Sequence, residues 1–333
     1  LSAAAEASLE AATRRALGDV DSPVEGLSIV AMGKLGGREL SYGSDLDVLF
    51  LYDPEAAPDP LEAPGYFTRI ARRIIRYVST FHAAGPGYEL DARLRPSGNQ
   101  GLLVTSLESF ARHHGLSVDG SELGSGLRPA VWERMALVRA RAVAGDPQIG
   151  VLGEMIARRA AFGPGAVRPG EAREVAHIRS RVERESSLER AGVVDVKLGR
   201  GGLLDVEFAV QLLQIHRGAE LGEDARSPEL PRALDALERV GVLDALHARV
   251  FRDAWRFFRK VELRLRVARA DASAALDERG PLLAPLARRL GLRDYPSHSA
   301  AEELLLRHHE VADAVRGSFE EIVESLTKAG APG

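Results

Sequence analysis

Residues 31–52 read Ala-Met-Gly-Lys-Leu-Gly-Gly-Arg-Glu-Leu-Ser-Tyr-Gly-Ser-Asp-Leu-Asp-Val-Leu-Phe-Leu-Tyr. The last five residues are an unbroken apolar run, which predicts a strand buried on both faces. Asp45 and Asp47 lie at its entry, two residues apart, so their side chains leave the same face with about 7 Å between Cα atoms. Two carboxylates in this position suit hard cations such as Mg²⁺, which prefer oxygen ligands. An Asp-x-Asp that only closes a turn before a strand is the alternative interpretation.

The glycines of this stretch favour phosphate binding, because they let the backbone approach a phosphate closely. A P-loop requires Gly-x4-Gly-Lys-Ser/Thr, and a dinucleotide fingerprint requires Gly-x-Gly-x-x-Gly at the start of a helix. Neither pattern is present, and the glycine-rich turn leads into a strand. We expect a phosphate-binding turn beside a metal site. Its candidate residues are Gly33, Lys34, Gly36, Gly37 and Ser44.

Size and composition indicate a globular protein with room for two domains. The chain has 333 residues, of which 45% are hydrophobic and 28% charged. A formal net charge of −4 argues against a broadly basic surface and therefore against a nucleic-acid partner. No apolar run approaches the roughly 20 residues of a membrane span, and no signal peptide pattern opens the chain. With no cysteine, a cytoplasmic enzyme fits, and a start at Leu1 rather than methionine suggests part of a longer protein.

Apolar periodicity predicts the other elements of the first half. These are a leading helix over 2–17, a strand over 27–32, a proline-rich loop to residue 64, and helices over 65–83, 107–114 and 132–141. We assign Arg134, Arg139 and Arg141 to the solvated face of the last of these helices, although nucleotide or protein binding is the alternative.

No strand is expected after about residue 148. Amphipathic helices follow one another to residue 327, which predicts an up-and-down bundle. We therefore expect a leading helix over 1–25, a catalytic domain over 26–147, a linker with a short helix over 148–169, and a helical bundle over 170–330.

Two further segments combine charge with regular spacing. Residues 88–95, Tyr-Glu-Leu-Asp-Ala-Arg-Leu-Arg, alternate strictly between apolar and charged, so we expect a strand whose charges face either solvent or a site. Residues 197–208, Lys-Leu-Gly-Arg-Gly-Gly-Leu-Leu-Asp-Val-Glu-Phe, place a second glycine turn before a helix whose start could favour an anion. Lys197, Asp205 and Glu207 belong either to a tight structural turn with acids paired to nearby arginines, or to the edge of a nucleotide cleft.

The turn and the Ser-Asp-Leu-Asp that follows resemble the signature of the DNA polymerase β-type nucleotidyltransferase superfamily. More narrowly, Gly-Lys-Leu-Gly-Gly-Arg-Glu-Leu at 33–40 and the segment at 197–208 are similar to the glutamine synthetase adenylyltransferase/adenylyl-removing enzyme family. Leu-Asp-Ala-Arg-Leu-Arg-Pro-Ser-Gly at 90–98, Gly-Leu-Leu-Val-Thr-Ser at 101–106 and the segment 132–141 also resemble that family, in its C-terminal adenylyltransferase half.

This resemblance implies an α+β chain, in which a polymerase β-like domain with a small mixed sheet and flanking helices precedes an all-α helical bundle. It further implies Mg²⁺-dependent transfer of AMP from ATP to a tyrosine of glutamine synthetase. Asp45, Asp47 and a third acid, Asp91, would bind two Mg²⁺, and Asp91 would act as or position the base. Arg93 and Arg95 would flank Asp91 and hold phosphate oxygens. Lys34 departs from the Ser or Gly that many superfamily members have there.

Three alternatives stay open. The first is phosphorolytic removal of AMP from adenylylated glutamine synthetase, against which the Arg-Pro-Ser-Gly segment favours addition. The second is a module of the same fold that senses nucleotide or the PII signalling protein without catalysis, against which the three acids argue. The third is a nucleic-acid nucleotidyltransferase, which the net negative charge disfavours.

Overall fold

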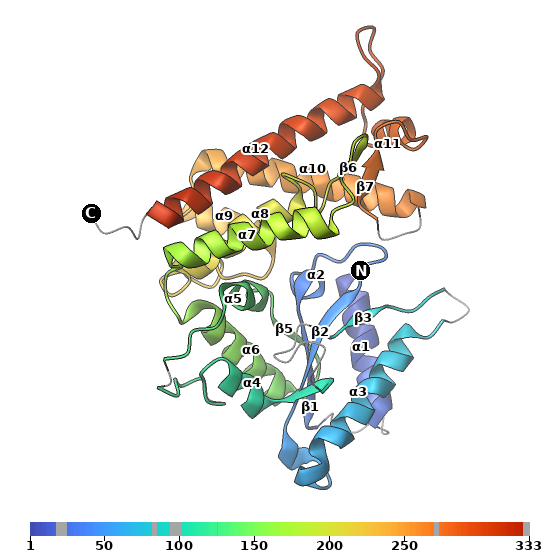
Figure 1. The fold of residues 1–333 in the computed structure, drawn as a ribbon. Helices are drawn as coiled ribbons and strands as arrows, with labels where there is room; N and C mark the ends of the chain where they lie inside the picture. The colour runs from blue at the N-terminus through green and yellow to red at the C-terminus, as the bar shows by residue number, and fades with distance from the viewer. Residues whose placement is uncertain (18–24, 82–84, 94–101, 125, 270–272, 329–333) are drawn as a thin grey trace. The chain divides into compact units, whose positions relative to one another are not determined.

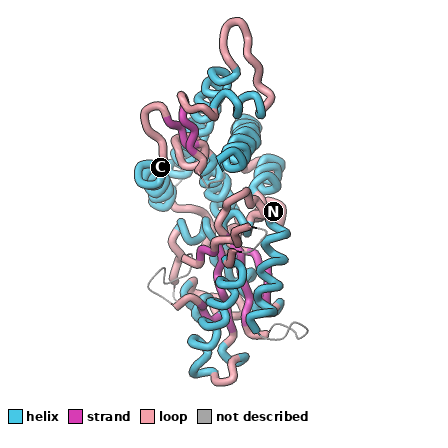
Figure 2. The backbone as a smooth tube through the Cα atoms, turned by 90° about the vertical axis from the view of Figure 1, so that its right-hand side faces the viewer, coloured by secondary structure: helices cyan, strands magenta, loops and turns pink. Residues whose placement is uncertain are grey.

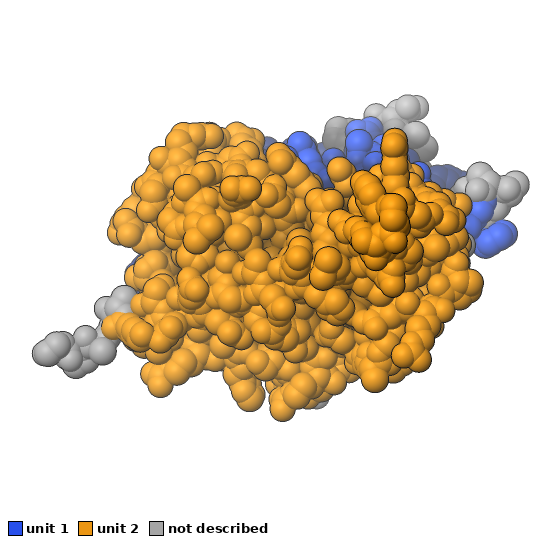
Figure 3. Space-filling model, turned by 90° about the horizontal axis from the view of Figure 1, so that it is seen from above, with its two compact units in different colours: residues 1–164, 227–229 blue, residues 165–226, 230–333 orange. Residues whose placement is uncertain are grey.

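The computed structural model describes residues 1–17, 25–81, 85–93, 102–124, 126–269 and 273–328. The chain divides into two compact units, which Figure 3 distinguishes by colour. Unit 1 comprises residues 1–164 and 227–229, and unit 2 comprises residues 165–226 and 230–333. Helices and strands are both present, as the α+β prediction requires. Within the described ranges, no helix combines the length and the apolarity that crossing a bilayer needs.

Unit 1 contains a small mixed sheet and helices (Figure 1). Its elements in chain order are α1 (Ser2–Leu17), β1 (Leu27–Ala31), α2 (Gly33–Gly36), β2 (Leu46–Tyr52), the 3-10 turns η1 (Pro54–Ala56) and η2 (Pro60–Glu62), α3 (Ala63–Ser79), β3 (Leu90–Asp91), β4 (Val104–Ser106), α4 (Leu107–His113), α5 (Val131–Leu137), β5 (Arg141–Gly145) and α6 (Pro147–Phe162). The strand order is β3-β2-β1-β5, and β4 also pairs with β2. β1 is antiparallel to β2 and to β5, whereas β3 and β4 run parallel to β2.

Helices cover both faces of this sheet (Figure 1 and Figure 2). On one face, α1 and α3 share a buried apolar cluster with alternate residues of β1 and β2, among them Ile29 and Phe50. On the other face lies α6, where a Cβ added to Gly153 would stand 2.6 Å from the Leu51 side chain and 3.5 Å from that of Val30. The strand predicted from the apolar run is confirmed, because β2 needs apolar side chains toward both layers.

The structure differs from the sequence prediction at two places in the sheet. Only Leu90 and Asp91 of the alternating segment 88–95 form a strand, and residues 94–101 lie outside the described residues. The helix expected over 132–141 ends at Leu137, and Arg141 begins β5, which supplies the free edge of β1 with hydrogen-bonding partners.

The segment expected as a linker with a short helix instead contains α6, a helix of 16 residues within unit 1. Asp146 caps it by accepting hydrogen bonds from the backbone N–H of Gln148 (2.8 Å) and Ile149 (3.3 Å), and Pro147 occupies its first position. Ile156 is fully buried. The helix packs against β1, β2 and β5, so it belongs to the layer on one face of the sheet.

Unit 2 is mainly helical (Figure 1). It contains α7 (Pro169–Ser186), β6 (Val193–Asp195), α8 (Leu203–Arg217), α9 (Leu230–Arg239), α10 (Ala245–Arg269), β7 (Ala275–Asp277), α11 (Leu283–Arg289) and α12 (Ala300–Lys328). The long helix α12 packs against α7, α8, α10 and α11. The prediction of an all-α bundle is wrong in one respect, because β6 and β7 form an antiparallel pair. The β-branched Val194 and its partner Leu276 are buried there, which favours a strand pair over another helical turn.

Candidate active site

Asp47 and Asp91 lie on adjacent parallel strands in direct register. β2 pairs with β3 so that Leu46 is opposite Leu90 and Asp47 is opposite Asp91. The backbone N–H of Leu46 donates to the carbonyl of Glu89 at 2.8 Å, which extends this pairing. Residues in register on neighbouring strands project to the same face, so the two carboxylates share one face of the sheet. Asp45 is exposed immediately before β2, whereas Asp47 and Asp91 are half-buried.

The guanidinium of Arg93 lies against the carboxylate of Asp91. Its Nε lies 2.9 Å from Oδ1 and 2.8 Å from Oδ2 of Asp91, and its backbone N–H donates to Oδ1 at 2.9 Å. The hydrogen bond and charge of Asp91 raise the pKa of Arg93, with smaller contributions from the charges of Asp45 and Asp47. The structure therefore brings Asp47, Asp91 and Arg93 together, and Asp45 lies immediately before β2.

The glycine turn packs directly against one of these acids. Gly33 opens α2 with φ of +48°, and a Cβ added there would lie 2.2 Å from Oδ2 of Asp47. The backbone N–H of Met32 donates to the carbonyl of Asp47 at 2.8 Å. Gly36, at the other end of α2, would place a Cβ 1.9 Å from the carbonyl oxygen of Arg139. The turn thus has no space for side chains where it meets β2 and the segment before β5.

Two arginines hold the carbonyl groups of this turn. Arg141 donates through Nε to the carbonyl of Gly36 (3.2 Å) and through Nη2 to that of Leu35 (3.1 Å). Arg139 Nη1 lies 3.5 Å from the Gly33 carbonyl oxygen. The assignment of Arg139 and Arg134 to a solvated face is wrong, since both are buried. Arg134 instead donates through Nε to the Ala161 carbonyl at the end of α6 (3.0 Å), where free helix carbonyls need donors.

The other predicted residues of the turn differ in their burial and in their contacts. Lys34 is half-buried within α2. The Ser44 hydroxyl accepts from the backbone N–H of Ser41 at 3.2 Å, so it shapes the turn that leads into Asp45. Gly37 is buried, with an added Cβ 3.0 Å from the Pro228 carbonyl oxygen. Arg95 lies outside the described residues.

The second glycine motif builds a buried ion cluster within unit 2. Asp205 is fully buried, with Oδ1 at 2.7 Å from Nε of Arg179 and 3.5 Å from Nη1 of Arg316. The backbone N–H of Gly201 donates to Oδ2 at 2.5 Å. Burial raises the pKa of Asp205, while both arginines act in the opposite direction. These contacts match the interpretation of Asp205 as an acid paired to nearby arginines.

Lys197 and Glu207, from the same motif, are half-buried. The backbone N–H of Lys197 donates to Oδ1 of Asp195 at 3.0 Å, and its carbonyl accepts from Leu204 at 3.0 Å. The motif's backbone thus forms the tight turn that its glycines predict.

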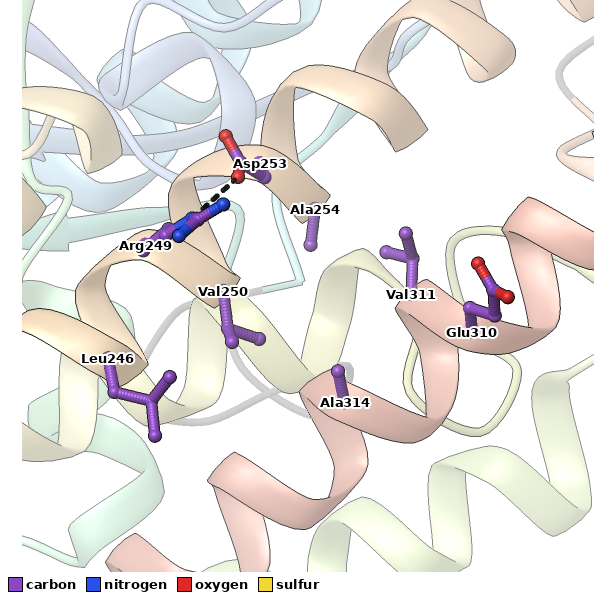
Figure 4. Close-up of a pocket in the computed structure, with 8 residues that line it drawn as sticks. All are labelled: Leu246, Arg249, Val250, Asp253, Ala254, Glu310, Val311 and Ala314. Carbon is purple, nitrogen blue, oxygen red and sulfur yellow. Dashed lines mark ion pairs between the residues drawn. The ribbon is translucent and has the colours of Figure 1, made fainter.

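A cavity of about 340 Å³ lies between α10 and α12 of unit 2 (Figure 4). Small and branched apolar side chains point into it, and its charged side chains include an Arg249–Asp253 ion pair at 3.8 Å. Its lining residues are Leu246, Arg249, Val250, Asp253, Ala254, Glu310, Val311 and Ala314. None of the residues predicted for nucleotide or metal binding lines this cavity.

The acidic face of unit 1 has the chemistry of a magnesium site. Asp45, Asp47 and Asp91 offer only carboxylate oxygens, which are the ligands Mg²⁺ prefers. The glycine turn packs against Asp47, and turns of this kind can bind phosphates through backbone N–H groups. The donor set therefore fits Mg²⁺ together with a nucleotide phosphate.

Comparisons with known proteins find similar sequences for both units. Residues 1–154 match the family model of glutamate-ammonia ligase adenylyltransferase, and residues 174–323 match that of PII-uridylyltransferase. The bifunctional glutamine synthetase adenylyltransferase/adenylyl-removing enzyme of Methylococcus capsulatus is 36% identical over 270 residues, which are 78% of this chain and 26% of that protein. The proteins of the same name from Burkholderia pseudomallei and Nocardia farcinica are 38% and 31% identical over 79% and 90% of this chain, and 28% of each relative.

This chain thus spans about a quarter of the length of the curated relatives it matches. The similarity nevertheless extends through both units, since the two family models together reach from residue 1 to residue 323. The chain belongs to the family of glutamate-ammonia ligase adenylyltransferases.

Proposed function

We propose that this chain catalyses Mg²⁺-dependent transfer of AMP from ATP to a tyrosine hydroxyl of glutamine synthetase. The observation that supports this best is the convergence of three carboxylates beside a glycine turn: Asp47 is in register with Asp91 and packs against Gly33. Unit 1 would be the catalytic domain, with a nucleotidyltransferase fold of the DNA polymerase β type.

In this proposal Asp45, Asp47 and Asp91 hold two Mg²⁺ ions, which when bound neutralise phosphate charge and stabilise the attacking and departing oxygens. The start of α2 at Gly33 and Lys34, with Ser44, binds the β- and γ-phosphates. Gly36 and Gly37 shape this turn, because their N–H groups donate to the carbonyls of Met32 and Gly33. The tyrosine oxygen forms a bond to the α-phosphorus in line with the α–β phosphoanhydride bond, which breaks as pyrophosphate leaves. Asp91 receives or positions the hydroxyl proton, and Arg93 holds its carboxylate in place.

A second reaction that this site could carry out is the removal of AMP. An oxygen of inorganic phosphate would attack the phosphorus of the AMP-tyrosine linkage, so that ADP forms and the tyrosine hydroxyl is released. The relatives' name includes the removal of adenylyl groups. We infer a further role for unit 2 from its match to the PII-uridylyltransferase model. It would link the full-length protein to the PII signalling protein.

A direct test mixes the chain with glutamine synthetase and Mg²⁺-ATP and searches for a tyrosine carrying AMP by peptide mass spectrometry. Asp47→Asn should abolish the transfer and leave the fold intact. The matched control is Asp53→Asn, at the far end of β2, where Asp53 only caps the η1 turn through Oδ1. Transfer by Asp47→Asn at the wild-type rate would refute the proposed site. Incubating adenylylated synthetase with phosphate in parallel separates addition from removal.

A further inference from the structure

Three potential metal ligands meet at a place in unit 1 distinct from the three aspartates. His113 ends α4, His114 follows it, and Glu133 lies in the first turn of α5. One ligand atom from each residue lies within 4.8 Å of the other two. The closest approach joins Nε2 of His113 to Oε1 of Glu133 at 2.9 Å. Residues 20 positions apart in sequence therefore converge without any role in the proposed transfer of AMP.

The His114 side chain is unusual for a buried polar group. It is only 6% exposed, and its Nδ1 has no hydrogen-bond partner among the described residues. Its ring packs edge-on against Phe110 and against His113, with centroid distances of 5.0 Å and 4.8 Å. Burial, with a smaller contribution from His113, lowers the pKa of His114 to about 4. A neutral imidazole keeps a lone pair on one ring nitrogen, as a metal ligand must.

The glutamate is already held in a defined orientation. Its Oε2 accepts a hydrogen bond from the backbone N–H of Ala130 at 3.1 Å, which leaves Oε1 directed at His113. The side chains of His113 and Glu133 are 34% and 17% exposed. An ion and its water ligands can therefore reach the cluster from the His113 side, whereas His114 closes it on the side of the core.

We propose that His113, His114 and Glu133 bind one Zn²⁺ ion, with water in the remaining position. Two imidazoles and one carboxylate are a frequent zinc ligand set, and imidazole suits Zn²⁺ far better than it suits Mg²⁺. Zinc–ligand bonds of about 2.0–2.2 Å require donor atoms roughly 3.3 Å apart. Small side-chain rotations achieve this from a starting separation of at most 4.8 Å.

Such an ion would connect two helices that the chain joins only through the loop from residue 114 to residue 130. Both α4 and α5 pack against α6, the layer that covers one face of the sheet. Zinc would stabilise the folded state by binding it in preference to the unfolded chain. Binding of Zn²⁺ should accordingly raise the temperature of unfolding.

The test uses the untagged, chelator-treated chain in the presence of excess Mg²⁺. Titration with Co²⁺, followed through its visible absorption, and competition with Zn²⁺ should show one equivalent bound. His113→Ala and His114→Phe should each weaken Zn²⁺ binding by at least about tenfold. Loss of a residue that only supports a metal ligand already lowers metal affinity by about that factor. The phenylalanine keeps the ring packing against Phe110. His177→Ala is the matched control, because His177 is exposed on α7.

A second control separates the two candidate metal sites. The double variant Asp45→Asn, Asp47→Asn should bind Zn²⁺ as the wild type does if the histidine cluster is the site. Loss of binding in this variant, with retention in His113→Ala, would overturn the proposal and assign the ion to the aspartates. Absence of saturable one-to-one binding in the wild type would overturn it as well. Circular dichroism of each variant verifies that the fold is retained.

Discussion

Gly33→Ala tests whether the rate of AMP transfer depends on the exact position of the Asp47 carboxylate. The added Cβ would lie 2.2 Å from Oδ2 and 2.9 Å from Cγ of Asp47. Carbon and oxygen atoms in ordinary contact are about 3.4 Å apart, so the carboxylate must move by roughly 1 Å. Residue 33 also has φ of +48°, where a side chain costs about 1–2 kcal/mol of stability.

A displacement of about 1 Å in a catalytic group can lower turnover by about 100-fold, which corresponds to roughly 2.7 kcal/mol in the activation barrier. We therefore expect Gly33→Ala to lose about two orders of magnitude in AMP transfer while remaining folded. The rate is measured by mass spectrometry of glutamine synthetase after timed incubation with Mg²⁺-ATP. Urea unfolding of the same preparation gives the loss of stability.

Gly241→Ala is the matched control for backbone strain. Gly241 has φ of +73°, and a Cβ added there meets no atom within 4 Å. This variant should lose a similar amount of stability and keep wild-type transfer. If Gly33→Ala also kept wild-type transfer, then the position of Asp47 would not matter to the reaction, and the proposed role of this carboxylate would be wrong.

Two further predictions concern unit 2. Asp205→Asn leaves the buried guanidinium groups of Arg179 and Arg316 short of an anion, so the free energy of unfolding in urea should fall by about 3 kcal/mol; an unchanged value would show that the cluster contributes nothing. His308 packs on Phe258, and burial, together with His309, lowers its pKa to about 4. Because His308 takes up a proton in the unfolded state below about pH 6.5, its contribution to stability should be complete above that pH and fall by about 3 kcal/mol as the pH drops to 4. His308→Phe should lack this part of the pH dependence in urea titrations at several pH values, and an identical slope in both proteins would refute the assignment.

The central strand and its acids were predictable from sequence because their signal is local. Residues 48–52 are continuously apolar, and β2 is covered by helices on both faces. The spacing of Asp45 and Asp47 follows from the period of a strand alone. The pairing of Asp47 with Asp91 confirms the prediction that the third acid lies on a strand next to β2. The resemblance supplied that expectation, since no local pattern specifies which strands become neighbours.

The contacts of Arg134, Arg139 and Arg141 were not predictable from helical periodicity. Arg134 lies on a short helix and satisfies the Ala161 carbonyl at the end of another, 27 residues away. Arg139 and Arg141 lie where the helix has already ended, and they bind carbonyls of α2 more than 100 residues earlier in the chain. A signal was nevertheless present at Arg141, because Ala-Val-Ala follows it and favours a strand over another helical turn.

Asp205 and the histidine cluster likewise depend on contacts between residues far apart in the sequence, which local patterns do not specify. The sequence offered two interpretations of Asp205, and its arginine partners Arg179 and Arg316 lie 26 and 111 residues away. His113 and His114 carry no recognisable spacing to Glu133 along the chain. Their convergence arises only because α4 and α5 both pack on α6.

The two strands that carry the acids differ greatly in length, and this has a consequence for how the site could be controlled. β2 spans seven residues in the centre of the sheet, whereas β3 spans two at its edge. A shift of β3 by one residue would turn Asp91 to the opposite face and would separate Leu90 from Leu46, while the pairing of β2 with β1 could remain. The amide of Leu46, bonded to Glu89, should exchange its hydrogen with solvent much faster than the amides between β1 and β2. Fraying of a two-residue strand could thus switch catalysis on and off while the domain stays folded, and it offers protein engineers a place to adjust activity separately from stability.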